Sequence, residues 1–260
     1  MEYTWKDEGA AGSGIAAGSV LLSAFPSAGL ATLVAGHYMI RALKIPRVGR
    51  FDSPDIAPIA VVQGGEVNPT VRVYGRKDLG LVLSEFPPTP PQANALARAI
   101  LAGAEARKAR MIICLEGVVP HPDEAEPEKS PEPDPEEHIW AAFSNADPAL
   151  QKTFLAARAR PLEDGVIGGV SGALLVQSIG RPIPVVALLV SARVAEGLPD
   201  HRAGAALIET LDRLMPELRI DTKPLREQAE QIERVLRAAL QRRPTEAPPE
   251  TTPPGSEMYG

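Results

Sequence analysis

The chain has 260 residues, of which 44% are hydrophobic and 23% charged, and its formal net charge is −6. This composition is typical of a globular protein with a sizeable core, and the acidic balance argues against nucleic acid or an anionic membrane as the partner. The single cysteine, Cys114, excludes an intramolecular disulfide. The first residues lack the regions of a signal peptide, and no apolar run is long enough to span a bilayer. We therefore expect a cytoplasmic protein.

The N-terminal half is predicted to alternate between strands and helices. The apolar run 19–24 predicts a strand, and 30–43 has apolar residues at helical spacing, with Ser27 as the expected N-cap. Three further strands, rich in β-branched residues and separated by glycines, are predicted at 56–62, 67–74 and 79–86. A helix at 92–109 and a buried strand at 111–115 follow.

The segment 121–138 interrupts this pattern. It holds eight acidic residues, five prolines and a single lysine. Such a segment cannot bury enough apolar surface to offset the entropy of ordering, so a disordered or extended surface loop is predicted.

The C-terminal part continues the alternation. Strands are predicted at 139–143 and 185–190. Helices are predicted from Asp147 to about 159, from an N-cap at Asp200 to 214, and from 221–224 onward. Together the elements predict an α/β fold with a mixed β-sheet sandwiched by helices. We place this domain at 19–240, between an N-terminal extension at 1–18 and a flexible tail at 241–260.

Few residues point to catalysis or metal binding. Cys114 ends an apolar run and is expected to be a buried, inert thiol. His37, His121, His138 and His201 lack paired ligand spacing, so no metal site is predicted.

A glycine-rich stretch is the best candidate for binding a phosphate or nucleotide. Its glycines are Gly165, Gly168, Gly169 and Gly172, and glycine lets backbone amides approach an anion. No lysine or hydroxyl residue follows in P-loop order. Close packing at a helix-to-strand turn explains these glycines equally well.

The chain ends in Met258, Tyr259 and Gly260. They follow a stretch, 241–257, whose five prolines favour extended conformations. An apolar side chain, a tyrosine and a carboxylate at the tip of a stiffened arm can bind a pocket that offers a lysine or backbone amides. Most C-terminal tripeptides are nevertheless frayed ends without a role, so the composition of the tripeptide leaves both interpretations open.

Several motifs occur in a characteristic order: FPSAG at 25–29, RVGRFDS at 47–53, LVLSEFPP at 81–88 and GVIGGVSGALL at 165–175, followed by two closing helices. In this order they resemble the proteasome assembly chaperone family over about residues 19–240. The resemblance implies a fold similar to purine nucleoside phosphorylases and an archaeal-type protein that is not an enzyme and needs no cofactor. The implied partners are the α-ring of the proteasome core particle and either further copies of the chain or a paralogue.

The resemblance also implies how the protein docks. Family members insert a C-terminal hydrophobic–tyrosine–any-residue motif between adjacent α-subunits, and the terminal carboxylate pairs with a pocket lysine. Met258, Tyr259 and Gly260 match this motif. Two features depart from the family pattern: the acidic insertion 121–138, and His201 where an Asp-Pro pair is common. The competing interpretation is an enzyme of the nucleosidase, phosphorylase or ATP-dependent carboligase type that uses the loop 165–172.

Overall fold

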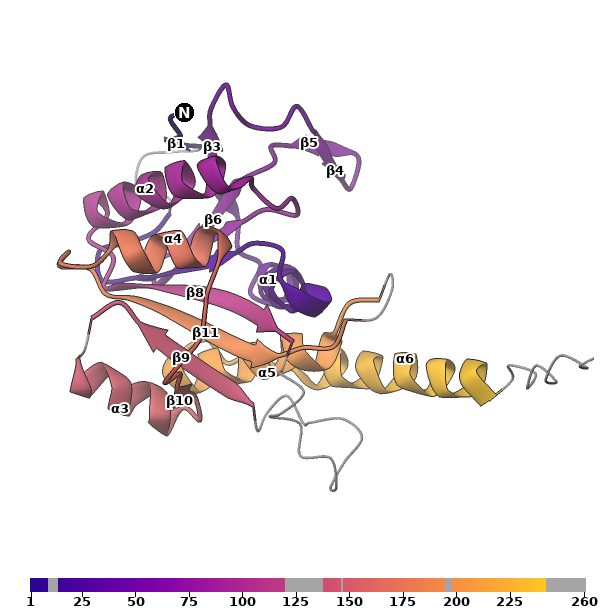
Figure 1. Ribbon diagram of the computed structural model, residues 1–260. Helices are drawn as coiled ribbons and strands as arrows, with labels where there is room; N and C mark the ends of the chain where they lie inside the picture. Colours follow the sequence, from indigo (N-terminus) through magenta and orange to yellow (C-terminus); the bar gives the residue numbers. More distant parts are fainter. Residues whose placement is uncertain (9–13, 120–137, 146, 195–197, 242–260) are drawn as a thin grey trace, which may run out of the picture.

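A nine-stranded mixed sheet runs through the centre of the protein (Figure 1). The structure, a computed structural model, describes residues 1–8, 14–119, 138–145, 147–194 and 198–241. The sheet has the strand order β1-β3-β6-β7-β2-β8-β11-β9-β10. Its strands are β1 (Thr4–Asp7), β2 (Val20–Ala24), β3 (Arg47–Asp52), β6 (Arg72–Arg76), β7 (Leu79–Leu83), β8 (Met111–Val118), β9 (Ile139–Phe143), β10 (Arg160–Pro161) and β11 (Val185–Ser191). A separate hairpin joins β4 (Val61–Gln63) to β5 (Glu66–Asn68).

The four central strands, β7, β2, β8 and β11, are parallel to one another. Antiparallel strands flank them, with β6 and β3 on one side and β9 on the other. The central strands are buried on both faces, which explains why they appear in the sequence as continuous apolar runs rather than alternating ones.

Helices cover both faces of the sheet (Figure 1). Helices α2 (Pro90–Ala106) and α4 (Gly169–Gln177) pack on one face, where Leu96 and Leu174 share a core cluster with Ile112. Helices α1 (Ala31–Ala42), α3 (Pro148–Ala156) and α5 (His201–Leu214) pack on the other. A 3-10 turn, η1 (Ala28–Leu30), precedes α1. No helix in the described ranges is both long and apolar enough to cross a lipid bilayer.

Helix α6 (Lys223–Gln241) closes the described part of the chain. Leu225 and Ala229, in its first two turns, are buried, and its N-terminal part packs against α5. Its C-terminal half extends beyond the rest of the body (Figure 1).

Several predicted elements are confirmed. The strand at 139–143 has the predicted bounds, and the strand predicted at 111–115 continues to Val118. Asp200 caps α5, because its Oδ1 accepts from Ala203 N over 3.0 Å. Asp147 caps α3 in the same way, accepting from Ala149 N. The fold is thus a mixed α/β sheet covered by helices.

Other predictions are wrong. Ser27 is not the N-cap of α1: the turn η1 lies between them, and the Ser27 hydroxyl instead accepts from Gly117 N over 2.9 Å. In the strand predicted at 56–62, only the last residues are in a strand, β4. The strand predicted at 67–74 is interrupted at Pro69, because proline cannot donate a hydrogen bond to a neighbouring strand. The glycine-rich stretch leads into helix α4 rather than a strand.

Three strands, β1, β3 and the two-residue β10, were not predicted at all. Strand β1 lies within the expected extension 1–18 and pairs with β3, which was also missed. The expected acidic loop 121–138 lies outside the described residues except for His138.

Candidate functional site

The parallel strands β7, β2, β8 and β11 end at one edge of the sheet, which is where α/β proteins usually bind ligands. Glu116 lies near the end of β8, and Glu85 follows β7 by two residues. Glu116 contacts α4 on one face of the sheet, whereas Glu85 contacts α1 on the other. These two carboxyls are the centres of two polar clusters.

The glycine-rich stretch begins α4. Gly168 is its N-cap, and Gly169 has a φ of 62°, in the left-handed region that favours glycine. A Cβ on Gly172 would lie 2.2 Å from the carbonyl oxygen of Ile167, so Gly172 is required for packing. A Cβ on Gly165 would approach Leu162 at 3.1 Å, while Gly168 and Gly169 face open space.

Beneath this turn, the Ser171 hydroxyl donates to Glu116 Oε1. Burial raises the pKa of Glu116 to about 7, although the hydrogen bond from Ser171 opposes the rise. Cys114 is fully buried two residues earlier, and burial, followed by the nearby Glu116 charge, raises the pKa of its thiol far above the usual range. The expectation of a buried thiol is confirmed, and burial opposes the ionised, accessible form that a thiol nucleophile needs.

A groove lies on the opposite face, between α1, the start of α5, the first turns of α6 and the β4–β5 hairpin. Its volume is about 580 Å³. Twelve residues line it: Leu30, Leu33, Val34, His37, Ile40, Arg41, Gln63, Tyr74, Pro199, His201, Leu225 and Gln228.

The rim of the groove is held by a glycine turn. Gly29 has a φ of 61°, and a Cβ there would lie 2.6 Å from the carbonyl oxygen of Arg193. Asp200 N donates to Gly29 O over 2.7 Å, which ties the turn before α1 to the start of α5. Leu30 follows Gly29 and His201 follows Asp200, so this hydrogen bond brings both side chains to the same groove.

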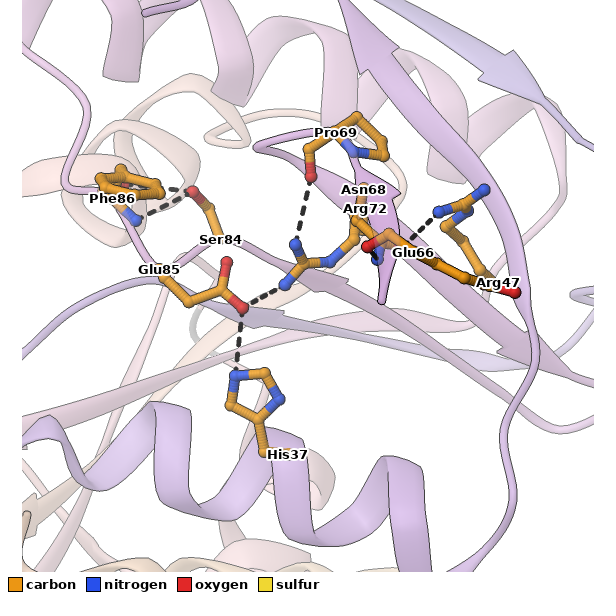
Figure 2. Close-up of polar contacts among 9 residues, drawn as sticks. All are labelled: His37, Arg47, Glu66, Asn68, Pro69, Arg72, Ser84, Glu85 and Phe86. Carbon is orange, nitrogen blue, oxygen red and sulfur yellow. Dashed lines mark hydrogen bonds and ion pairs between the residues drawn. The ribbon is translucent and has the colours of Figure 1, made fainter. Parts of the chain in front are cut away.

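Below the groove, one oxygen of Glu85 accepts from two side chains (Figure 2). His37 Nε2 lies 3.1 Å from Glu85 Oε1, and Arg72 Nη2 donates to the same oxygen. Arg72 is fully buried and also donates to Pro69 O over 3.1 Å. Burial alone would raise the pKa of Glu85, but His37 and Arg72 outweigh it and hold this pKa below its usual value.

Sequence reasoning did not identify this cluster. The spacing of the hairpin β6–β7 could have revealed it. The two-residue turn pairs Arg76 with Leu79, and this register places Arg72 opposite Leu83 and therefore close to Glu85. An arginine inside a buried strand next to a glutamate is a pattern typical of a paired buried charge.

The histidines are distributed unevenly. His37 and His201, which are far apart in the sequence, line the same groove. His138 instead packs on Trp140, and His121 lies outside the described residues. Within the described ranges, no group of three metal-binding side chains is placed to hold an ion. Met258, Tyr259 and Gly260 lie outside the described residues.

Comparison with known proteins identifies the family to which this chain belongs. The model of the PAC2 family matches residues 21–240. The chain belongs to the PAC2 family. A curated relative, the uncharacterized protein MJ0106 of Methanocaldococcus jannaschii, is 26% identical over 218 residues, which are 84% of each chain.

Two solved structures from Pyrococcus furiosus share the fold. PbaA, described as an archaeal homolog of proteasome-assembly chaperone, has a TM-score of 0.75 and 22% identity, covering 88% of this chain and 90% of PbaA. PbaB, described as an archaeal proteasome activator, has a TM-score of 0.73 and 20% identity, covering 92% of this chain and 99% of PbaB.

Proposed function

We propose that this chain is a cytoplasmic, non-enzymatic binding partner of the proteasome core particle. In this proposal Met258, Tyr259 and Gly260 dock into pockets between adjacent subunits of the α-ring. The observation that carries it is this tripeptide at the end of a PAC2-family chain. The relation of PbaA to proteasome-assembly chaperones and the description of PbaB as a proteasome activator support the choice of partner.

The position of α6 suits such docking. The helix has 19 residues and is therefore about 28 Å long. Its C-terminal half leads away from the sheet (Figure 1), so the arm 242–260 starts at a distance from the body. An arm of this length spans on the order of 25 Å as a coil.

A single tail offers few contacts. The Tyr259 ring supplies apolar area and a hydroxyl group, as is common at binding hot spots. A carboxylate paired with a lysine adds about 1.5–3 kcal/mol, against association costs of several kcal/mol. One tail should therefore bind weakly.

Several linked tails would bind much more tightly. We propose that the body assembles with further copies of itself or with a paralogue, so that several arms face one ring. Linkage of this kind raises the apparent affinity by roughly 10²–10⁴-fold without new contacts.

The test is a pull-down of core particles from the source organism by the full chain and by its tail variants. Tyr259→Ala and deletion of 258–260 should abolish capture, while Tyr259→Phe, which keeps the ring, should retain most of it. Intact mass spectrometry verifies that Gly260 ends the purified chain, and circular dichroism verifies the fold. Equal capture by the deleted chain would refute the proposal.

Peptidase activity of the captured particles separates two forms of this function. An activator increases cleavage of short peptides because the gate opens, whereas an assembly chaperone changes the yield of complete particles and leaves their activity unaltered.

An enzyme related to the purine nucleoside phosphorylase-like fold is the alternative, with the stretch 165–172 as its site. Ser171 and Glu116 form a hydroxyl–carboxyl pair there. Ser171 is only 2% exposed, however, so its hydroxyl is closed to a substrate in this conformation. We therefore favour the binding function.

A further inference from the structure

The groove beside α1 has the chemistry of a site for an acidic, apolar peptide end. Leu30, Leu33, Val34 and Leu225 provide apolar walls, and Arg41 provides a guanidinium beside the rings of His37 and His201. No carboxylate is among its lining residues. A cavity of about 580 Å³ is in the range that accommodates a few side chains.

Arg41 is the one arginine or lysine among the residues that line the groove, and its side chain is open to solvent. It is exposed in the last turn of α1 and makes no ion pair within the described part of the chain. Arg72, by contrast, is fully buried and occupied by Glu85. A carboxylate that enters the groove would therefore meet Arg41, whose guanidinium favours bidentate pairing.

The chain's own C-terminal segment has the complementary composition. Residues 244–260 contain three glutamates and no lysine or arginine, and they end in Met258, Tyr259 and Gly260. The segment thus combines negative charge with two large apolar side chains at its tip, which matches the walls and donors of the groove.

The distances allow this segment to return to the groove. The arm 242–260 starts at Gln241, and the groove reaches α6 at Leu225 and Gln228. Gln228 lies 13 residues before Gln241, which is about 20 Å along the helix. The r.m.s. span of a flexible arm of this length is about 24 Å, so the tip reaches the groove without being fully stretched.

We propose that the groove is an intramolecular docking site for Met258 and Tyr259, with the terminal carboxylate paired to Arg41. The docked tail is then withheld from other partners. This consequence rests on the proposed function, whereas the docking itself does not. The groove and the outside partner compete for the same tripeptide.

Disulfide trapping in the full chain tests the docking directly. Glu257→Cys is combined either with Gln228→Cys, which lines the groove, or with Glu230→Cys, an exposed position on the same helix and nearer to the arm. Native Cys114 is fully buried and does not compete. We expect the groove pair to form an intrachain disulfide about tenfold faster than the control pair, because docking raises the local concentration of the tip.

Two variants sharpen the result. Tyr259→Ala and Arg41→Glu, each introduced into the groove pair, should reduce its rate to that of the control. Equal rates for the groove and control pairs would overturn the proposal, as would disulfides that join two chains, which would show that the groove takes another copy's tail.

Core-particle affinity then separates this inference from the proposed function. Arg41→Glu, with the tail intact, should bind core particles about two- to tenfold more tightly, because the fraction of undocked tails rises. Selective trapping without any core-particle binding would leave the docking standing and refute the proposed function. Core-particle binding without selective trapping would refute the docking and leave the proposed function standing.

Discussion

Glu85 follows strand β7 and Glu116 lies near the end of strand β8, so both carboxyls are found at the same edge of the parallel sheet. They face opposite layers of helices and have opposite pKa shifts. The pKa of Glu85 is below its usual value, because His37 and Arg72 outweigh the effect of burial. The pKa of Glu116 is raised to about 7, because burial is opposed only by the Ser171 hydroxyl.

The difference reflects depth and partners together, because Glu116 is more deeply buried and meets only a hydroxyl, whereas Glu85 is less buried and meets His37 and Arg72. The α1 side of the sheet contains fixed charges and an open groove. The α4 side holds a carboxyl that is partly protonated at neutral pH beneath a packed glycine turn. In the proposal made above, the interacting groove of the body therefore lies on the α1 side.

The largest expected effect comes from breaking the Glu85 cluster. Arg72→Met keeps the side-chain length but leaves Glu85 without its buried cation, so the free energy of unfolding should fall by about 3–5 kcal/mol. Urea denaturation at pH 7 measures it. The double variant Arg72→Met with Glu85→Gln should recover part of the loss, since no unpaired carboxylate remains. Equal losses in both variants would show that Glu85 does not depend on Arg72.

The second prediction concerns pH and Glu116. Its pKa is raised in the folded state, so the folded protein binds the extra proton between about pH 4.5 and pH 7. Stability should therefore decrease as the pH rises through this range. Glu116→Gln, which can still accept from Ser171, should remove this dependence and be more stable than the parent by about 1–3 kcal/mol at pH 8.5.

The control for this prediction is the same pair of proteins at pH 4.5, where Glu116 is protonated in the folded state and the two stabilities should nearly agree. An unchanged slope of stability against pH in Glu116→Gln would assign the pH dependence to another group.

The elements that sequence predicted best have unambiguous local signals. Buried parallel strands such as β8 and β11 are continuous apolar runs, and Asp200 and Asp147 are typical N-caps. Strand β3 was missed because its inward residues Val48 and Phe51 are separated by the polar and glycine positions of a flanking strand.

The candidate sites needed tertiary information. Helix α4 has apolar residues on all sides, so its period could not be distinguished from that of a buried strand. His37, Arg72 and Glu85 meet only because α1 crosses the hairpin β6–β7, and His201 joins His37 only through the turn at Gly29. Contacts between distant segments follow from packing, which periodicity does not encode.

The smallest expected effect separates the two partners of Glu85. His37 is 29% exposed, so water and salt screen its contact more than that of Arg72. His37→Leu should therefore lower the free energy of unfolding at pH 7 by less than about 1 kcal/mol.

Glu85 has a lowered folded-state pKa, so its stabilising effect is present above its unfolded pKa and lost as the pH falls through the folded value. Because His37→Leu lets that pKa rise, the variant should lose less stability than the parent between pH 5 and pH 3, as measured by urea denaturation. A loss at pH 7 as large as that of Arg72→Met would instead make His37 the principal partner of Glu85 and place the decisive charge at the wall of the groove.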